Sequence, residues 1–116
     1  MPKVTIAYAG TTEADILRIV DFYKDTKPVG RAAIKAIRGM IALLATTPAL
    51  SSPVEADQFE HLRYARELPV RFGRSGYVIL YEFAPGSSIV TIIAIRHYRE
   101  AGYSFEKILF HEDDGD

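Results

Sequence analysis

The sequence predicts an α+β domain in which a helical hairpin packs on a small antiparallel sheet. Three observations support this class of fold. The first residues alternate as a strand does, residues 12–44 carry two apolar stripes with helical spacing, and residues 62–95 contain three strand-like runs. The expected order is β-α-α-β-β-β, and 116 residues suffice for one buried core. We expect one domain over residues 1–111, then an acidic, disordered tail over residues 112–116.

The N-terminal strand is expected over residues 3–9, where apolar side chains stand at every second position. A capping-box pattern then begins at Thr12, with a hydroxyl at the helix N-cap and a carboxylate at Asp15, three residues later. The helical stripe that follows continues to about Lys24. We therefore expect a first helix between Thr12 and Lys24, ending before the Lys27-Pro28 pair.

A second helix is expected to start near Val29 or Gly30 and to pair with the first as an antiparallel hairpin. Its apolar stripe consists of Ile34, Ile37, Ile41 and Leu44. Gly39 lies inside this stripe, where glycine costs about 1 kcal/mol relative to alanine. Close approach of the first helix is the simplest explanation for Gly39.

The C-terminal half predicts three consecutive strands, after a loop over residues 47–53 and irregular chain to about residue 60. Residues 62–72 alternate as a half-buried strand in which Arg66 falls on the apolar side and Pro69 indicates an edge or a bulge. Residues 77–83 and 89–95 are apolar on both faces. Since the hairpin covers one face only, the other needs a cover. A short C-terminal helix at residues 104–111, a second copy or another protein could supply it.

Positive charge is concentrated between residues 63 and 99, although the whole chain has a net charge of −1. Only two acids and no lysine occur in this stretch. Arginine suits phosphate and carboxylate groups better than lysine does, so these side chains are candidates for binding a target or a partner. The alternative is that they are solvated strand edges. The candidates are Arg63, Arg66, Arg71, Arg74, Arg96 and Arg99.

Other features exclude several classes of protein. The chain has no cysteine, so neither a disulfide framework nor thiolate chemistry is available. The N-terminus does not have the pattern of a signal peptide, and no apolar run reaches the length of about 18 residues typical of a membrane span. We expect a cytoplasmic protein that does not associate with membranes.

Four segments together resemble the RelE/ParE superfamily of small toxins from bacterial toxin–antitoxin modules, often labelled plasmid stabilisation proteins. They are TEADILRIVDFY from Thr12, LRYAREL from Leu62, FGRSGYVILYEF from Phe72 and IVTIIAIRHYREAGY from Ile89. The resemblance extends over residues 3–109. It implies a toxin fold, a cognate antitoxin encoded alongside, and no cofactor. We expect the antitoxin to be acidic and to cover the arginines between residues 63 and 99.

The superfamily contains two mechanisms. RelE-type members cut messenger RNA in the ribosome, which requires a base, an acid and cations but no metal. For that activity the resemblance implies a catalytic set of His97, Arg99, Arg71 and Tyr103. The alternative is that His97 caps a strand end and Arg99 pairs with Glu100.

ParE-type members poison DNA gyrase and have no known hydrolytic chemistry. Val78 and Pro69 stand where the best-known ribonuclease branch carries basic residues. The sequence therefore favours a ParE-like toxin acting on DNA gyrase. The alternatives are a ribosome-dependent messenger RNA endonuclease and a non-toxic protein-interaction module.

Overall fold

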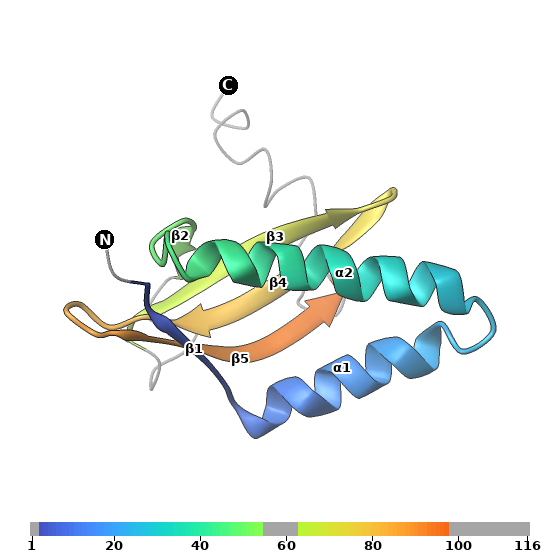
Figure 1. Ribbon diagram of the computed structural model, residues 1–116, viewed down its shortest axis with the longest axis horizontal. Helices are drawn as coiled ribbons and strands as arrows, with labels where there is room; N and C mark the ends of the chain where they lie inside the picture. Colours follow the sequence, from blue (N-terminus) through green and yellow to red (C-terminus); the bar gives the residue numbers. More distant parts are fainter. Residues whose placement is uncertain (1–2, 55–62, 98–116) are drawn as a thin grey trace.

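The computed structural model describes residues 3–54 and 63–97 (Figure 1). Within these ranges, no helix is both long and apolar enough to cross a membrane. The predicted C-terminal helix at residues 104–111 and the acidic tail at residues 112–116 lie outside the described residues. The elements are β1 (Thr5–Tyr8), α1 (Gly10–Phe22), α2 (Lys27–Leu44), β2 (Ser52–Pro53), β3 (Ala65–Phe72), β4 (Ser75–Glu82) and β5 (Ile89–His97).

The sheet confirms the α+β class, with the strand order β1-β5-β4-β3-β2. Strands β3, β4 and β5 form the predicted antiparallel meander. The sheet is nevertheless mixed, because β1 pairs with β5 in parallel. Parallel neighbours need a long connection between them, and here nearly the whole domain separates the two strands. The two-residue strand β2, which pairs antiparallel with β3, lies where a loop was expected.

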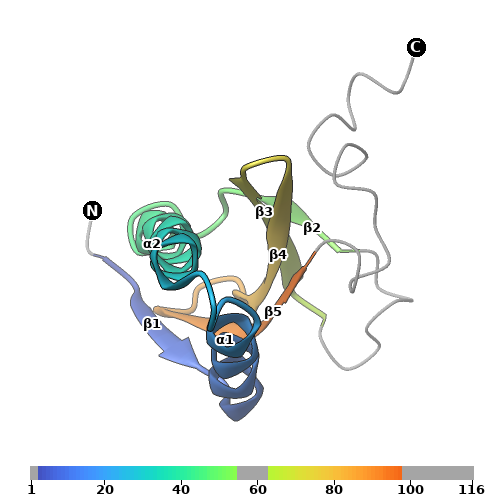
Figure 2. The ribbon, with the colours of Figure 1, turned by 90° about the vertical axis from the view of Figure 1, so that its right-hand side faces the viewer.

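The two helices contact different parts of the sheet. α2 lies against one face, over β3 and β4, whereas α1 lies alongside β5 (Figures 1 and 2). The core between α2 and the sheet contains Ile37, Leu44, Ile79 and Tyr81, all essentially inaccessible to solvent. Successive residues of a strand point to opposite faces. Val78, between two core residues of β4, is also buried at 3% exposure, so both faces of this strand are buried, as predicted.

The predicted capping box at the start of α1 is wrong. α1 begins at Gly10, and its N-cap, Ala9, makes no side-chain capping hydrogen bond. Thr12 therefore lies within the first turn, and its hydroxyl donates to the carbonyl oxygen of Ile92 in β5 at 2.8 Å. The hydroxyl thus donates to a carbonyl of the neighbouring strand, instead of accepting from a backbone N–H of its own helix as a capping residue does.

The glycine that permits close approach of the helices is Gly30, not Gly39. A Cβ atom on Gly30 would lie 2.8 Å from the Cβ of Tyr23, whereas one on Gly39 would meet nothing within 4 Å. The approach is near the corner because α2 starts at Lys27, earlier than expected. Proline at position 28 is tolerated there, since the first turn of a helix needs no N–H donor from it.

Candidate functional site at the end of the sheet

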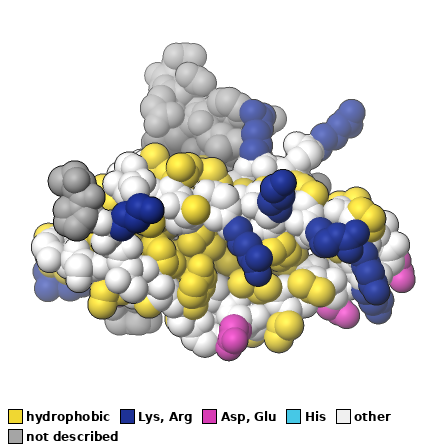
Figure 3. Space-filling model, in the orientation of Figure 1, with side chains coloured by type: hydrophobic (Ala, Val, Ile, Leu, Met, Phe, Trp, Pro, Cys, Tyr) yellow, Lys and Arg dark blue, Asp and Glu magenta, His cyan; other side chains and the backbone are white. Residues whose placement is uncertain are grey.

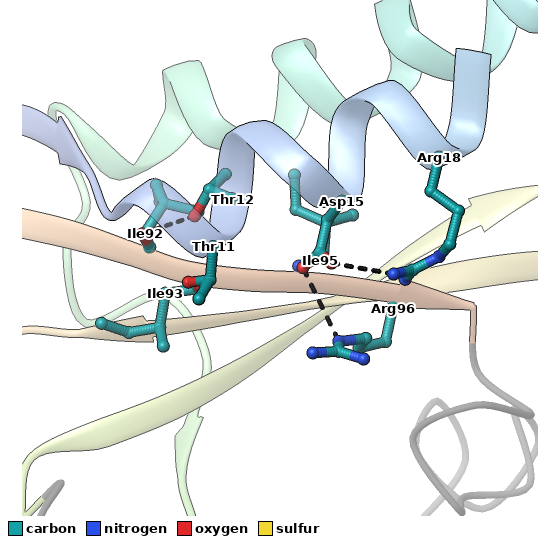
Figure 4. Close-up of polar contacts among 8 residues, drawn as sticks. All are labelled: Thr11, Thr12, Asp15, Arg18, Ile92, Ile93, Ile95 and Arg96. Atoms are coloured by element: carbon teal, nitrogen blue, oxygen red, sulfur yellow. Dashed lines mark hydrogen bonds and ion pairs between the residues drawn. The ribbon is translucent and has the colours of Figure 1, made fainter. Parts of the chain in front are cut away.

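Side chains of α1 form hydrogen bonds with backbone groups on the edge of β5, near the point where its pairing with β1 ends (Figure 4). The last register pair of the two strands is Tyr8 with Ile92. After it, Thr11 donates a hydrogen bond to the carbonyl of Ile93, and the N–H of Ile95 donates to the carboxylate of Asp15 at 2.8 Å. With Thr12, which donates to the carbonyl of Ile92, three side chains of α1 thus make hydrogen bonds to the edge of β5 at and beyond the end of its pairing with β1.

Asp15 is the centre of this contact. Its side chain is only 3% exposed and accepts from Arg18 at 3.2 Å. The Nε atom of Arg96, on β5, lies 3.6 Å from the other carboxylate oxygen. The side chain of Arg96 is 47% exposed. One of the candidate binding arginines is therefore already paired with an acid of α1, although half of its surface still faces solvent.

His97 ends β5 beside the start of β4. Its Nε2 atom is hydrogen-bonded to the hydroxyl of Ser75, and its ring meets the ring of Tyr77 edge-on with centroids 5.7 Å apart. Tyr77 and His97 are also direct register partners. The imidazole is thus held by two neighbours on β4. His97 thus lies at the end of a strand, and its contacts with Ser75 and Tyr77 fix the orientation of its imidazole ring.

The register separates His97 from Arg71. Val70, Tyr77 and His97 form one row across three strands, on the face that α2 covers. Arg71 follows Val70 on β3 and pairs with Gly76, so its side chain belongs to the opposite face. Both residues lie at the same end of the sheet, but the backbone directs them to different sides of it.

Pro69 and Val78, which stand where the ribonuclease branch carries basic residues, face one another across neighbouring strands. Pro69 on β3 pairs with Val78 on β4, and Val78 pairs in turn with Arg96 on β5. Side chains directly opposite one another have Cβ atoms about 5 Å apart. The face that carries Arg71 therefore has an apolar pair where the ribonuclease branch has two cations.

The candidate arginines do not form one patch. Arg66 lies on the face toward the helices and donates to the carbonyl of Ser51, which anchors the chain near β2. The guanidinium of Arg63 lies 5.9 Å from the centre of the Tyr64 ring.

Arg71 lies five residues beyond Arg66 along β3, or about 17 Å at the rise of a strand. Exposed Arg74 lies in the turn that follows, at the same end as Arg71. Arg99 and Tyr103 lie outside the described residues.

Sequence reasoning missed Ser75, and it assigned Asp15 a different role, that of the carboxylate in a capping box. The sequence signal for Asp15 was its position in the buried stripe of α1, with Thr12 and Ile19 at spacings of three and four. An acid in a buried helical stripe requires a partner. Ser75 carried no such signal, because its contact with His97 depends on the pairing of β4 with β5.

Two solved structures share this arrangement of a helical hairpin on a sheet. One is a chromosomal ParDE toxin–antitoxin system from P. aeruginosa, with 14% identity, a TM-score of 0.61, and coverage of 82% of this chain and 96% of that chain. The other is the toxin–antitoxin complex RelBE2 from Mycobacterium tuberculosis, with 18% identity, a TM-score of 0.52, and coverage of 82% and 98%. The three proteins therefore share a fold.

The family follows from the sequence itself. The model of a family described as "ParE toxin of type II toxin-antitoxin system, parDE" matches residues 6–102. The chain belongs to this ParE toxin family. Among curated proteins, none matches the chain.

Proposed function

We propose that this toxin acts in the ParE-like manner, by poisoning DNA gyrase in the cytoplasm. The observation that carries the proposal is the apolar Pro69–Val78 pair, on the face and at the end of the sheet where Arg71 lies. A ribonuclease needs cations there to stabilise the charge of the phosphorane, and each missing clamp costs about 2 to 4 kcal/mol of transition-state stabilisation. Binding to a protein target has no such requirement.

The separation of His97 from Arg71 supports the same proposal. A general base and a phosphate-binding cation must meet at one reacting group. In this chain the two side chains belong to opposite faces of the sheet. Arg71, Arg74 and the exposed half of Arg96 then serve as a binding surface, and their planar guanidinium groups suit carboxylates of a partner.

Expression of the chain in growing cells tests the target. Poisoned gyrase should give double-strand breaks in the chromosome and an SOS response while messenger RNA stays intact. Purified gyrase incubated with the toxin should accumulate cleaved DNA. Fragmented messages with an intact chromosome would instead establish the ribonuclease.

The His97→Ala variant adds a residue-level test. If His97 is only a strand-end residue, the variant should arrest growth as the parent does, provided that its circular dichroism spectrum shows that it folds. A ribonuclease that uses His97 as its base should lose at least about 100-fold in the rate of message cleavage. Asp25→Ala, in the exposed corner between α1 and α2, is the control for a surface substitution away from the candidate arginines.

An acidic antitoxin is the proposed partner of the candidate arginines. Arg71 lies on the face of the sheet away from the helices, whereas Arg66 faces the helices and donates to the carbonyl of Ser51, so an acidic segment that follows the outer edge of β3 would reach Arg71 and not Arg66. Beyond residue 67, β3 has no partner on its outer side among the described strands, so an added strand could pair with it. Co-purification of the neighbouring gene product tests this partner.

A further inference from the structure

The corner between α1 and α2 and the turn between β3 and β4 lie at the same end of the molecule, on the right in Figure 1 and towards the viewer in Figure 2. Aromatic side chains join them. The ring of Tyr23, directly after α1, meets the ring of Phe72 at the end of β3 edge-on, with centroids 6.4 Å apart. The hydroxyl of Tyr23 also lies 3.1 Å from the hydroxyl of Tyr77 on β4. The corner of the hairpin is thus fastened to the sheet.

Phe22 is the exposed member of this aromatic cluster. Its ring meets the ring of Tyr23 edge-on, with centroids 4.9 Å apart. At 76%, its exposed fraction is the largest of any large apolar residue in the part of the chain that the structure describes. The core therefore makes little use of this ring, and its apolar surface is available to a partner.

The position of Phe22 is fixed before any partner binds. The adjacent Tyr23 packs against Gly30, where an added Cβ would lie 2.8 Å from the Cβ of Tyr23. Tyr23 is held on its other side by the ring and the hydroxyl of the sheet described above. An aromatic anchor on a backbone that is already ordered loses little conformational entropy when it binds.

Two arginines flank the exposed ring. Arg18 is four residues before Phe22 and shares its face of α1; its side chain is 45% exposed, although it pairs with Asp15. Arg74 is exposed in the β3–β4 turn, two residues after Phe72. Charged and hydrophobic side chains both reach the surface at this end of the molecule, on the right in Figure 3. Aromatic residues and arginine are the types enriched at protein interfaces. We call Arg18, Phe22 and Arg74 the corner surface.

We propose that the corner surface docks on DNA gyrase, with Phe22 inserted into an apolar pocket of the enzyme. Arg18 and Arg74 then face carboxylates beside that pocket. The identification of gyrase rests on the proposed function, whereas the shape and charge of the surface do not. The inference deepens that function, because it adds an apolar anchor to the arginines assigned there.

Three other occupants match the corner surface less well. The antitoxin proposed above adds to the outer edge of β3, along the strand and not at the corner. A nucleic acid would bring phosphates to Asp21, an exposed acid directly before Phe22, whereas a protein can place its acids opposite Arg18 and Arg74 alone. A second copy related by a two-fold axis would bring the same arginines of both copies to one interface.

Purified DNA gyrase and supercoiled plasmid test the proposal, with the full chain as the poison and linear DNA as the readout. Phe22→Ala should require at least about tenfold more toxin for half-maximal cleavage, because truncation of an interface anchor weakens binding by at least that factor. Arg74→Glu, which reverses a charge of the surface, should also weaken the toxin. Leu43→Ala is the matched control, since Leu43 is an exposed apolar residue at the opposite end of α2; its potency should not change. Thermal unfolding should give similar stabilities for Phe22→Ala and Leu43→Ala.

The results separate this inference from the proposed function. If the native chain causes no gyrase-dependent cleavage, gyrase is not its target and both proposals fail. If the native chain causes cleavage and Phe22→Ala is equally potent, the proposed function stands and the corner surface is refuted as its docking site.

Three further measurements identify a wrong occupant. If folded Phe22→Ala also fails to capture the neighbouring gene product, the corner surface belongs to the antitoxin. If the chain binds a DNA oligonucleotide without gyrase and Phe22→Ala weakens that binding, the occupant is nucleic acid. If the free chain dimerises in sedimentation and Phe22→Ala abolishes the dimer, the occupant is a second copy. Each of these results overturns the proposal.

Discussion

Replacing Asp15 with alanine removes the residue that ties α1 to β5. In the native structure the buried carboxylate accepts from the N–H of Ile95 at 2.8 Å and lies 3.2 and 3.6 Å from the guanidinium groups of Arg18 and Arg96. Alanine leaves the N–H of Ile95 without this acceptor on the strand edge next to α1. We expect a marked loss of stability from this single change.

The magnitude follows from the separate contacts. A hydrogen bond to a charged acceptor contributes about 1.5 to 3 kcal/mol. Arg18 and Arg96 are 45% and 47% exposed, so solvent screens their ion pairs, each worth about 0 to 1 kcal/mol. The free energy of unfolding should therefore fall by about 2 to 4 kcal/mol, most of it from the contact with Ile95.

Urea denaturation measures the loss, and hydrogen exchange locates it at the amide of Ile95, which should lose protection by more than its neighbours in β4. Asp21→Ala is the matched control, since Asp21 is an exposed acid of the same helix, and should change stability by less than about 0.5 kcal/mol. Arg18→Ala should cost no more than about 1 kcal/mol. If Asp15→Ala proves as mild as Asp21→Ala, the carboxylate is not what holds α1 to β5.

Three other substitutions test the packing, each by thermal unfolding. Gly30→Ala should destabilise the domain by about 1 to 3 kcal/mol, because its Cβ would lie 2.8 Å from that of Tyr23. Gly39→Ala should instead stabilise the domain by about 0.5 to 1 kcal/mol. If Gly39→Ala proved the more destabilising of the two, the helix contact at Gly30 described above would be contradicted. Tyr81→Phe removes a hydroxyl that donates to the carbonyl of Pro48 at 2.9 Å, and should cost about 1 to 2 kcal/mol. No loss in that variant would show that the segment before β2 is held by other contacts.

The parts of the fold that local patterns determine could be predicted from the sequence. The stripe from Ile34 to Leu44 identified the buried side of α2, and alternation along β3 placed Leu68 and Val70 in the core. The apolar character of residues 77–83 on both faces agrees with the burial of Val78. Each of these depends on the period of a helix or a strand, which neighbouring residues reveal.

The pairing of distant segments could not be predicted in the same way. The parallel contact of β1 with β5 depends on the path of the whole chain, and nothing in residues 5–8 specifies a direction. The same contact changed the role of Thr12, because the carbonyl of Ile92 is within its reach only when β5 lies beside α1. The wrong capping box at Thr12 and the wrong expectation of a purely antiparallel sheet thus have one cause, the unpredicted pairing of β1 with β5.

The candidate site was predicted only in part. The arginine-rich stretch drew attention to residues 63–99, but the strand register divides those arginines between two ends and two faces of the sheet. Phe22 and Tyr23 were equally visible at the end of the first helix. Their different roles depend on the contact of Tyr23 with Phe72, which the stripes themselves do not specify.

The two sides of α1 should differ in what they contribute to stability. Thr12, Asp15 and Ile19 are buried and face inward, while Leu17 and Val20 are exposed in a hollow between α1 and α2. Positions 15 and 17 are 200° apart on a helix of 3.6 residues per turn, so a glutamate at position 17 leaves the Asp15 contacts in place. Leu17→Glu should therefore retain the stability of the native domain in urea denaturation, whereas Asp15→Ala should lose stability. If both variants unfold alike, Leu17 would be part of the core and not of the exposed surface of α1.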